Sequence, residues 1–310
     1  MEDLFYRELT RILKAKGVQK NEPLSRHTTF RIGGPADYFA VPSCTRELKD
    51  LLLLCKQEKV PYMILGNGSN LLVSDLGFRG VVIHNEFKTL PKLQEEKRGI
   101  LLSADADLPL SKISLFAAEA GLEGLEFAAG IPGSFGGAVV MNAGAYGSEI
   151  KDFLVSVDVL DEFGQEKTLQ KQQLQYGYRT SIFQNISDVV LRAVFLLKKG
   201  QKEQIKAQIN QYAQTRKEKQ PLEYPSAGST FKRPEGNYAG KLIMEAGLKG
   251  VKVGGAQVSE KHCGFVINTG EATSQDVICL MRMIQQRVKE QSGILLEPEI
   301  KMVGEFPETW

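Results

Sequence analysis

The first segment that could do chemistry is Leu65–Asn70 (LGNGSN), in which glycine and small polar residues follow an apolar run. Such a turn after a strand lets backbone N–H groups approach an anion closely, as in phosphate sites. No Gly-Lys-Ser/Thr follows, so this is not a P-loop. Leu71 stands where a Rossmann fingerprint needs its third glycine. By itself, the segment is compatible with anion binding or with a tight hairpin turn.

The second candidate is Gly130–Gly137 (GIPGSFGG), which has four glycines in eight residues and continues as AVVMNAGAYG. A stretch with so little side-chain bulk either packs backbone against backbone or lies along a large flat ligand. We expect positive φ angles and a closely apposed ligand at Gly136 and Gly137, so that valine is excluded there. Two such loops fit a dinucleotide with a pyrophosphate and a ring system.

Three polar motifs follow the glycine-rich loops. Arg179 lies in YRTSIF, where an arginine is most often a solvated surface charge. Ser229 lies in GSTFKRP, where a serine after glycine, leading into a strand, can present its hydroxyl at a domain interface. The nucleophile elbow Gly-x-Ser-x-Gly is absent and the chain has 3 His, so Ser-His-Asp hydrolysis is not supported. Alternation places Glu297 and Glu299 on one strand face unless Pro298 introduces a kink; the alternative is a solvated pair at a strand edge.

Hydrophobic periodicity and turn residues predict the elements that position these motifs. The helical segments include a strongly polar one at 200–220, which suits an exposed helix bridging two domains. Strands alternate with helices through the rest of the chain. The predicted helices are 2–16, 45–58, 108–121, 200–220, 239–247 and 273–293, and the predicted strands lie within 60–65, 81–85, 100–105, 154–169, 188–200, 254–259, 264–270 and 294–304.

Composition sets the outer limits of function. The 310 residues carry a net charge of +2, with 42% hydrophobic and 25% charged residues, as in a globular protein of two or three domains. The near-neutral charge argues against binding nucleic acid through bulk charge, and the apolar runs are too short to span a bilayer. The N-terminus lacks a signal-peptide core, which predicts a cytosolic protein. The 4 Cys form no CxxC pair, so we expect free thiols and no metal site.

Taken together and in this order, six segments resemble the UDP-N-acetylenolpyruvoylglucosamine reductase (MurB) family. The resemblance extends from about residue 20 to residue 304. The segments are HTTFRIGGPADYF (27–39), LGNGSNLLVSD (65–75), AGIPGSFGGAVVMNAGAYG (129–147), YRTSIF (178–183), GSTFKRP (228–234) and LEPEIKMVG (296–304).

The resemblance implies an α+β protein with an FAD-binding fold of the vanillyl-alcohol-oxidase type and a C-terminal α+β substrate domain. It implies an N-terminal FAD-binding subdomain at 1–80, a second one at 81–218, and a substrate-binding domain at 219–310. The C-terminal part is short, and GSTFKRP runs almost directly into AGKLIMEAGLKG. The chain therefore resembles the shorter subclass, which lacks an inserted loop bearing a tyrosine.

The resemblance also implies residue roles. Ser229 matches the family's proton donor, while Arg179 and Glu299 match the residues that stabilise the enolic intermediate. FAD is expected to bind non-covalently, since neither glycine-rich loop contains His or Cys, and NADPH is the expected reductant. The pyrophosphate is expected on the two glycine-rich loops, at Gly66, Asn67, Gly68, Ser69, Asn70, Gly130, Ile131, Pro132, Ser134, Gly136 and Gly137.

The implied substrate is the small molecule UDP-N-acetylglucosamine enolpyruvate, reduced to UDP-N-acetylmuramate in peptidoglycan precursor synthesis. Arg233 replaces an asparagine that is common in the longer enzymes, so the resemblance does not identify the residues that bind the UDP moiety. The candidates are Tyr224, Lys232, Arg233 and His262, each equally compatible with a solvated surface position. The resemblance predicts a monomer, with neither nucleic acid nor membrane as a partner.

Two other functions deserve comparison. A flavin-dependent oxidase on the same fold often tethers its flavin to a histidine, but His27 and His84, the only histidines in the flavin half, do not adjoin the glycine-rich loops. A catalytically silent UDP-sugar-binding protein would not need Arg179, Ser229 and Glu299 together. Bleaching of the flavin by NADPH without oxygen separates the reductase from the oxidase, and a yellow purified protein argues against the silent binder.

Overall fold

The computed structural model describes residues 4–306. Contacts within the chain divide it into two compact units. Unit 1 contains the described residues up to Gln19, together with Tyr38–Asn67 and Gly80–Thr215; unit 2 contains Lys20–Asp37, Gly68–Arg79 and the described residues from Arg216 onward. The three-part division predicted from the sequence stays a prediction.

The first part of the chain forms two helices and a four-stranded sheet. The strand order is β1-β2-β5-β3, and β3 runs parallel to β5. Leu48 and Leu51 of α2 and Ile83 of β5 are fully buried in the core that the helices and the sheet share. The elements are α1 (Leu4–Leu13), β1 (Val18–Pro23), β2 (Pro35–Ala40), α2 (Thr45–Gln57), β3 (Tyr62–Ile64) and β5 (Phe78–Ile83), with short 3-10 turns at Ala15–Gly17 and Leu24–His27.

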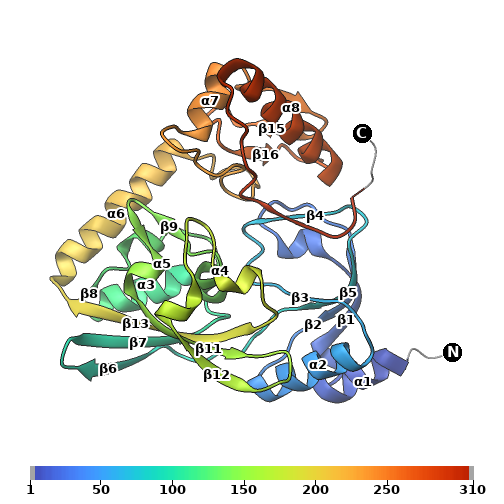
Figure 1. The fold of residues 1–310 in the computed structure, drawn as a ribbon, viewed down its shortest axis with the longest axis vertical. Coiled ribbons are helices and arrows are strands. Elements are labelled where there is room, and N and C mark those ends of the chain that lie inside the picture. The colour runs from blue at the N-terminus through green and yellow to red at the C-terminus, as the bar shows by residue number, and fades with distance from the viewer. Residues whose placement is uncertain (1–3, 307–310) are drawn as a thin grey trace. The chain divides into compact units, whose positions relative to one another are not determined.

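A larger antiparallel sheet forms the main layer of unit 1 (Figure 1). Its order is β12-β11-β13-β7-β6, with β8 paired to the end of β13. Helices α3, α4 and α5 pack on it, and the rings of Phe135 and Phe195 meet edge to face with centroids 5.0 Å apart. The elements are β6 (Lys92–Glu96), β7 (Gly99–Asp105), α3 (Leu110–Glu119), β8 (Leu122–Glu123), α4 (Phe135–Val140), α5 (Ile150–Phe153), β11 (Leu154–Leu160), β12 (Glu166–Gln170) and β13 (Val189–Lys199), with 3-10 turns at Glu126–Ala128, Lys171–Leu174 and Ile182–Gln184.

Two further elements of this region matter for the site. A small hairpin joins β9 (Gly144–Ala145) to β10 (Ser148–Glu149). The polar helix α6 (Lys202–Lys219) was expected to be exposed, yet it buries Ile205 and Ile209 against Ala118 of α3. Two apolar residues four positions apart lie on one helix face, which is enough to anchor a polar helix.

Unit 2 has its own apolar core, which includes Phe30, Leu72 and Ile284. Helix α8 begins with a capping box at Thr273 and ends at Gly293 in the left-handed conformation, as helix termini commonly do. Strand β4 near the start of the chain pairs in parallel with β17 near its end. The elements are β4 (Leu71–Val73), α7 (Ala239–Glu245), β14 (Lys252–Val253), β15 (Ala256–Val258), β16 (Val266–Asn268), α8 (Ser274–Ser292) and β17 (Lys301–Val303).

Most helix boundaries agree with the sequence predictions to within a few residues. The helix predicted at 2–16 extends only to Leu13 in its described part, because Lys14 adopts a positive φ of 62° that ends it. The strand predicted within 294–304 is limited to Lys301–Val303, and the preceding segment contains Pro298, which cannot donate to a ladder.

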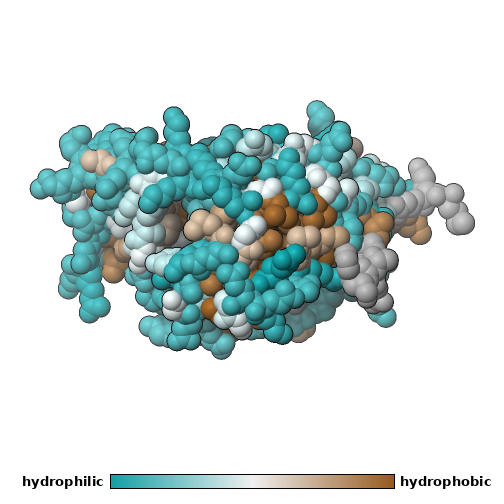
Figure 2. All heavy atoms as spheres, turned by 90° about the horizontal axis from the view of Figure 1, so that it is seen from above, coloured by the Kyte–Doolittle hydropathy of each residue, from teal (hydrophilic) through white to brown (hydrophobic). Residues whose placement is uncertain are grey.

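The face shown in Figure 2 is mostly hydrophilic, with a smaller group of hydrophobic residues among the polar ones. No helix among residues 4–306 combines the length and the apolar character that crossing a membrane requires.

Candidate active site

The two glycine-rich loops meet within unit 1. A Cβ built on Gly66 would lie 2.1 Å from Ser134 Oγ, so only glycine fits against this hydroxyl. The Asn67 side chain donates from Nδ2 to the Pro132 carbonyl over 3.1 Å. The first loop follows β3, and the second leads into α4, where Ser134 is the N-cap and accepts from the Gly137 N–H. Within unit 1, Gly66 and Asn67 of the first loop therefore contact Ser134 and Pro132 of the second.

The glycines of α4 do not have the positive φ angles that the sequence predicts, and only Gly136 is closely packed. Gly136 and Gly137 are in the first turn of the helix and are absent from the residues with positive φ. A Cβ on buried Gly136 would lie 2.7 Å from Ala106 Cβ, whereas a Cβ on exposed Gly137 would meet only Ser134 Oγ, at 3.1 Å. The φ argument is wrong for both residues, and the exclusion of valine at Gly136 comes from Ala106.

The rest of the first loop belongs to unit 2. Gly68 has a φ of 59°, and a Cβ there would lie 2.1 Å from the His27 carbonyl oxygen, so this position does require glycine. The Asn70 side chain donates to the Glu299 carbonyl over 3.1 Å. Among residues 4–306, none accepts a hydrogen bond from the backbone N–H groups of Asn67, Gly68, Ser69 or Asn70. Such a run of N–H donors fits an anionic ligand.

Arg179 is held in a tight turn of unit 1. The turn is closed by reciprocal backbone hydrogen bonds between Gly177 and Thr180, of 3.1 and 3.4 Å, and Arg179 itself has a left-handed φ of 56°. Its Nη2 donates to the Gly144 carbonyl over 2.9 Å and its Nη1 to the Asn142 carbonyl over 3.5 Å. The half-buried guanidinium is therefore oriented by backbone carbonyls of the β9–β10 region, with no carboxylate in these two bonds.

Ser229 and Glu299 lie on adjacent segments of unit 2. Phe231 and Pro298 form an antiparallel bridge, and the Glu299 N–H donates to the Thr230 carbonyl over 2.9 Å. Thr230 is buried and its hydroxyl accepts from the Val266 N–H, which ties the segment that carries Ser229 to β16. Ser229 itself is exposed and Glu299 is half-buried. The structure thus brings these two predicted residues onto neighbouring backbone segments of one unit.

The four residues predicted to bind the UDP moiety of the substrate have different surroundings. Lys232 forms an ion pair with Glu297, and its backbone N–H donates to the Glu297 carbonyl. The Arg233 guanidinium lies 4.0 Å above the Tyr238 ring. Burial lowers the pKa of His262, and its Nδ1 accepts from the Gly264 N–H, so the imidazole stabilises a turn. Tyr224 is exposed.

Sequence reasoning missed Asn142 as a functional candidate. It is wholly buried, and its side chain joins three backbone or side-chain groups around Arg179. The only signal was an amide residue within an otherwise small and apolar stretch, AVVMNAGAYG. Sequence reasoning also missed the stack of Tyr146 on Tyr212, whose ring centroids lie 3.9 Å apart.

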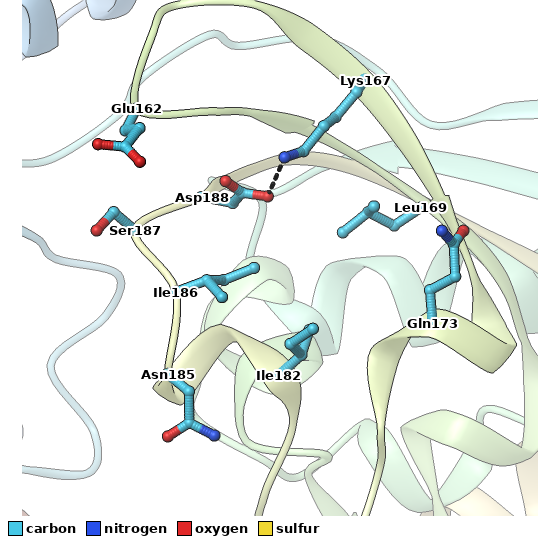
Figure 3. Close-up of a pocket in the computed structure, with 9 residues that line it drawn as sticks. All are labelled: Glu162, Lys167, Leu169, Gln173, Ile182, Asn185, Ile186, Ser187 and Asp188. Atoms are coloured by element: carbon cyan, nitrogen blue, oxygen red, sulfur yellow. Dashed lines mark ion pairs between the residues drawn. The ribbon is translucent and has the colours of Figure 1, made fainter.

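A cavity of about 490 Å³ lies elsewhere in unit 1 (Figure 3). Lys167 and Asp188 form an ion pair of 2.8 Å across it, and Ile182 and Ile186 supply apolar surface. None of the predicted site residues lines it. As for metal ligands, the part of the chain from residue 4 to residue 306 contains no group of three His, Cys, Asp or Glu side chains that could hold an ion.

Comparison with known proteins gives the same picture from independent data. Residues 36–170 match the family described as "FAD binding domain", and residues 220–303 match "UDP-N-acetylenolpyruvoylglucosamine reductase, C-terminal domain". The chain is 53% identical over 305 residues to a UDP-N-acetylenolpyruvoylglucosamine reductase of Caldanaerobacter subterraneus, covering 98% of this chain and 100% of the relative. It is 51% identical over 306 residues to that of Lachnoclostridium phytofermentans, covering 98% and 99%.

Solved structures agree. The crystal structure of the reductase MurB from Thermus caldophilus is 37% identical and superimposes with a TM-score of 0.78, over 93% of this chain and 99% of that one. A variant of Phl p 4 described as a glucose oxidase is 11% identical, with a TM-score of 0.50 over 64% of this chain and 44% of that one, which is a likeness of fold alone.

Proposed function

The chain belongs to the UDP-N-acetylenolpyruvoylglucosamine reductase family, and we propose that it performs this family's reaction with Arg179, Ser229 and Glu299 as catalytic residues. The predicted fold class, an FAD-binding fold with an added C-terminal domain, is confirmed. The enzyme is an FAD-dependent oxidoreductase that reduces the enolpyruvyl group with NADPH in peptidoglycan precursor synthesis. The short C-terminal part fits the shorter subclass.

The residues of the two glycine-rich loops fit FAD. Four consecutive N–H groups at 67–70 are not used by other described residues, and the backbone of Gly66 packs closely against the Ser134 side chain of the second loop. Backbone N–H groups bind a pyrophosphate without presenting side-chain bulk. We assign the cofactor contacts to Gly66–Asn70 and to the residues predicted within Gly130–Gly137. When bound, the flavin supplies the hydride for the reduction, and NADPH restores that hydride.

Arg179 stabilises the negative charge that develops on the substrate. Reduction of an enolpyruvyl ether places charge on one alkene carbon and on the adjacent carboxylate. A guanidinium that is already oriented by the Gly144 and Asn142 carbonyls needs little reorganisation to meet this charge. The contribution of the Arg179 guanidinium is electrostatic and does not involve proton transfer.

Ser229 delivers the second hydrogen as a proton. Its hydroxyl is exposed, next to Gly228 with a φ of 76° and open space around it. A serine alkoxide is a poor resting state, so the proton must be replaced from solvent or from a nearby cation. Lys232 is the conceivable helper on the same segment, although its ion pair with Glu297 already occupies it in part. Glu299 orients the carboxyl end of the substrate when its own carboxyl group is protonated, because two carboxylates would repel each other.

We assign the UDP moiety to the cations of the GSTFKRP segment, Lys232 and Arg233, with Tyr224 as a further contact. Arg and Lys bind phosphate through charge-assisted hydrogen bonds. His262 is the weakest of the four candidates because its Nδ1 is already used within the chain. The cytosolic location and the monomeric state remain predictions.

The observation that carries the catalytic assignment is the backbone pairing that holds the Ser229 and Glu299 segments together. The test is Ser229→Ala in anaerobic stopped-flow. Bleaching of the flavin by NADPH should stay near normal, while reoxidation by the enolpyruvyl substrate should slow by about 10²–10⁴-fold, the usual contribution of a positioned general acid. Ser292→Ala is the matched control, because the Ser292 hydroxyl bonds only to the local backbone, donating to the Val288 carbonyl and accepting from the Ile294 N–H.

Two results would contradict the proposal. If both half-reactions of Ser229→Ala slow equally, or neither slows, Ser229 is not the proton donor. If the wild-type protein reoxidises with oxygen as fast as with the enolpyruvyl substrate, an oxidase function is favoured over the reductase.

A further inference from the structure

The backbone turn that carries Arg179 is tied to the β9–β10 hairpin by one buried side chain. Asn142 has no exposed surface and lies just after α4, with a left-handed φ of 43°. Its Nδ2 donates to the Gly177 carbonyl over 2.9 Å and to Glu149 Oε2 over 3.0 Å. Its Oδ1 accepts from the Lys151 N–H over 3.0 Å. Both amide hydrogens and the amide oxygen therefore have partners.

The hydrogen bonds of the Asn142 side chain involve the two backbone segments that determine where the Arg179 guanidinium lies, the Gly177–Thr180 turn and the β9–β10 hairpin. Gly177 opens the turn that holds Arg179, and Glu149 lies on β10 opposite Gly144, whose carbonyl accepts from Arg179 Nη2. Asn142 also supplies its own carbonyl to Nη1. One residue thus holds the backbone of Arg179 through Gly177 and the acceptors of its guanidinium through the hairpin.

The energetics favour a positioning role over simple packing. A buried amide whose partners are removed costs stability, which explains why each donor and acceptor is used. Asparagine is also one of the few non-glycine residues that tolerate the left-handed conformation. An apolar residue of similar size would fill the space, but it could neither adopt this φ readily nor tie Gly177 to Glu149.

We propose that Asn142 is a positioning residue for Arg179: its side chain locks the Gly177–Thr180 turn to the β9–β10 hairpin and so sets the direction of the guanidinium. The inference rests on the proposed catalytic role of Arg179. Asn142 does not contact the substrate in this proposal and acts only through Arg179.

The test is a double-mutant cycle in the holoenzyme, with Asn142→Gly and Arg179→Lys separately and together. Glycine keeps the left-handed φ and removes the amide. We expect Asn142→Gly to slow substrate-dependent reoxidation by roughly 10- to 100-fold, since small misplacements of catalytic groups cost rate on this scale. Reduction by NADPH should stay unchanged. In the Arg179→Lys background, the additional effect of Asn142→Gly should fall to less than about 2-fold, because coupled residues are not additive.

The matched control is Gln175→Gly, which replaces another left-handed residue, with φ 48°, two positions before Gly177. Its side chain is exposed, and we expect neither rate to change. FAD content and thermal unfolding are measured for every variant. If Asn142→Gly does not purify as folded holoenzyme, Asn142→Asp goes through the same cycle, because aspartate tolerates this φ and keeps the Oδ1 acceptor but lacks the Nδ2 donor.

The outcomes separate this inference from the proposal on which it rests. If Arg179→Lys alone is reoxidised by the substrate at the wild-type rate, the catalytic role of Arg179 is refuted, and with it the positioning role. Slow reoxidation by Arg179→Lys, with the same loss from the Asn142 substitution in both backgrounds, would refute only the positioning role. No loss from the Asn142 substitution in the enzyme that keeps Arg179 would also refute the positioning role.

Discussion

Gly66→Ala tests the contact between the two glycine-rich loops. The new Cβ would lie 2.1 Å from Ser134 Oγ and 3.0 Å from Ser134 Cβ. Ser134 cannot move away easily, because it is buried, caps α4 and bridges to Pro109. Overpacking of this kind costs about 1–3 kcal/mol of unfolding free energy. At about 2–4 °C per kcal/mol for a large domain, the melting temperature should fall by roughly 2–12 °C.

The double variant shows whether Ser134 is the group that collides with the new methyl group. Ser134→Ala alone removes the N-cap and should cost about 1 kcal/mol. In Gly66→Ala/Ser134→Ala the 2.1 Å contact is gone and only the Cβ–Cβ approach of 3.0 Å remains. The combined loss should therefore be at least about 0.5 kcal/mol smaller than the sum of the single losses, which is the usual lower range for residues in contact.

The assay is urea unfolding followed by circular dichroism, with and without saturating FAD. Measuring both forms separates lost packing from lost cofactor stabilisation, since a ligand that binds the native state adds stability by mass action. Gly137→Ala is the matched control. Its Cβ would meet the same Oγ at 3.1 Å, and alanine is favoured over glycine inside a helix, so stability should hardly change. Single losses that add within about 0.3–0.5 kcal/mol, or no loss in Gly66→Ala, would refute the reasoning.

Four further outcomes are expected. Arg179→Lys should lose turnover but keep its flavin. A planar guanidinium can bind the backbone carbonyls and a substrate carboxylate together, whereas an ammonium group cannot; normal turnover would contradict this. Gly136→Val should yield apoprotein or insoluble protein, because its Cβ would lie 2.7 Å from Ala106 Cβ; full flavin occupancy on purification would exclude that clash. Acid precipitation should release the yellow colour into the supernatant, and colour in the pellet would mean a covalent flavin. Burial raises the pKa of Cys55 to about 12, so a thiol reagent at pH 8 should modify exposed Cys44 first, and equal rates would refute the burial argument.

Much of the local structure follows from the sequence alone. The capping box at Thr273, the glycine after α8 and the turn between β11 and β12 are local signals, because they depend on residues close together in the chain. The two glycine-rich loops and their separation were also readable, as were Arg179, Ser229 and Glu299 through the family motifs. These features need no knowledge of distant contacts.

Tertiary structure decided what the glycines and polar residues are used for. Asn67 and Pro132 are 65 residues apart in the chain, so their hydrogen bond could not be inferred from either loop. Gly136 is required by Ala106 and not by its own φ, because its partner comes from the end of another strand.

The same holds for Asn142 and for the segment that contains Glu299. Their partners lie in distant parts of the sequence: Gly177 for the first, Asn70 and Thr230 for the second. A side chain's chemistry is visible in the sequence, but its hydrogen-bond partners are set by which backbone groups the fold leaves within about 3 Å of it. The sequence therefore determined which groups are available to bind and react, whereas the packing of the chain decided how the Arg179 guanidinium is held and which glycines cannot be replaced.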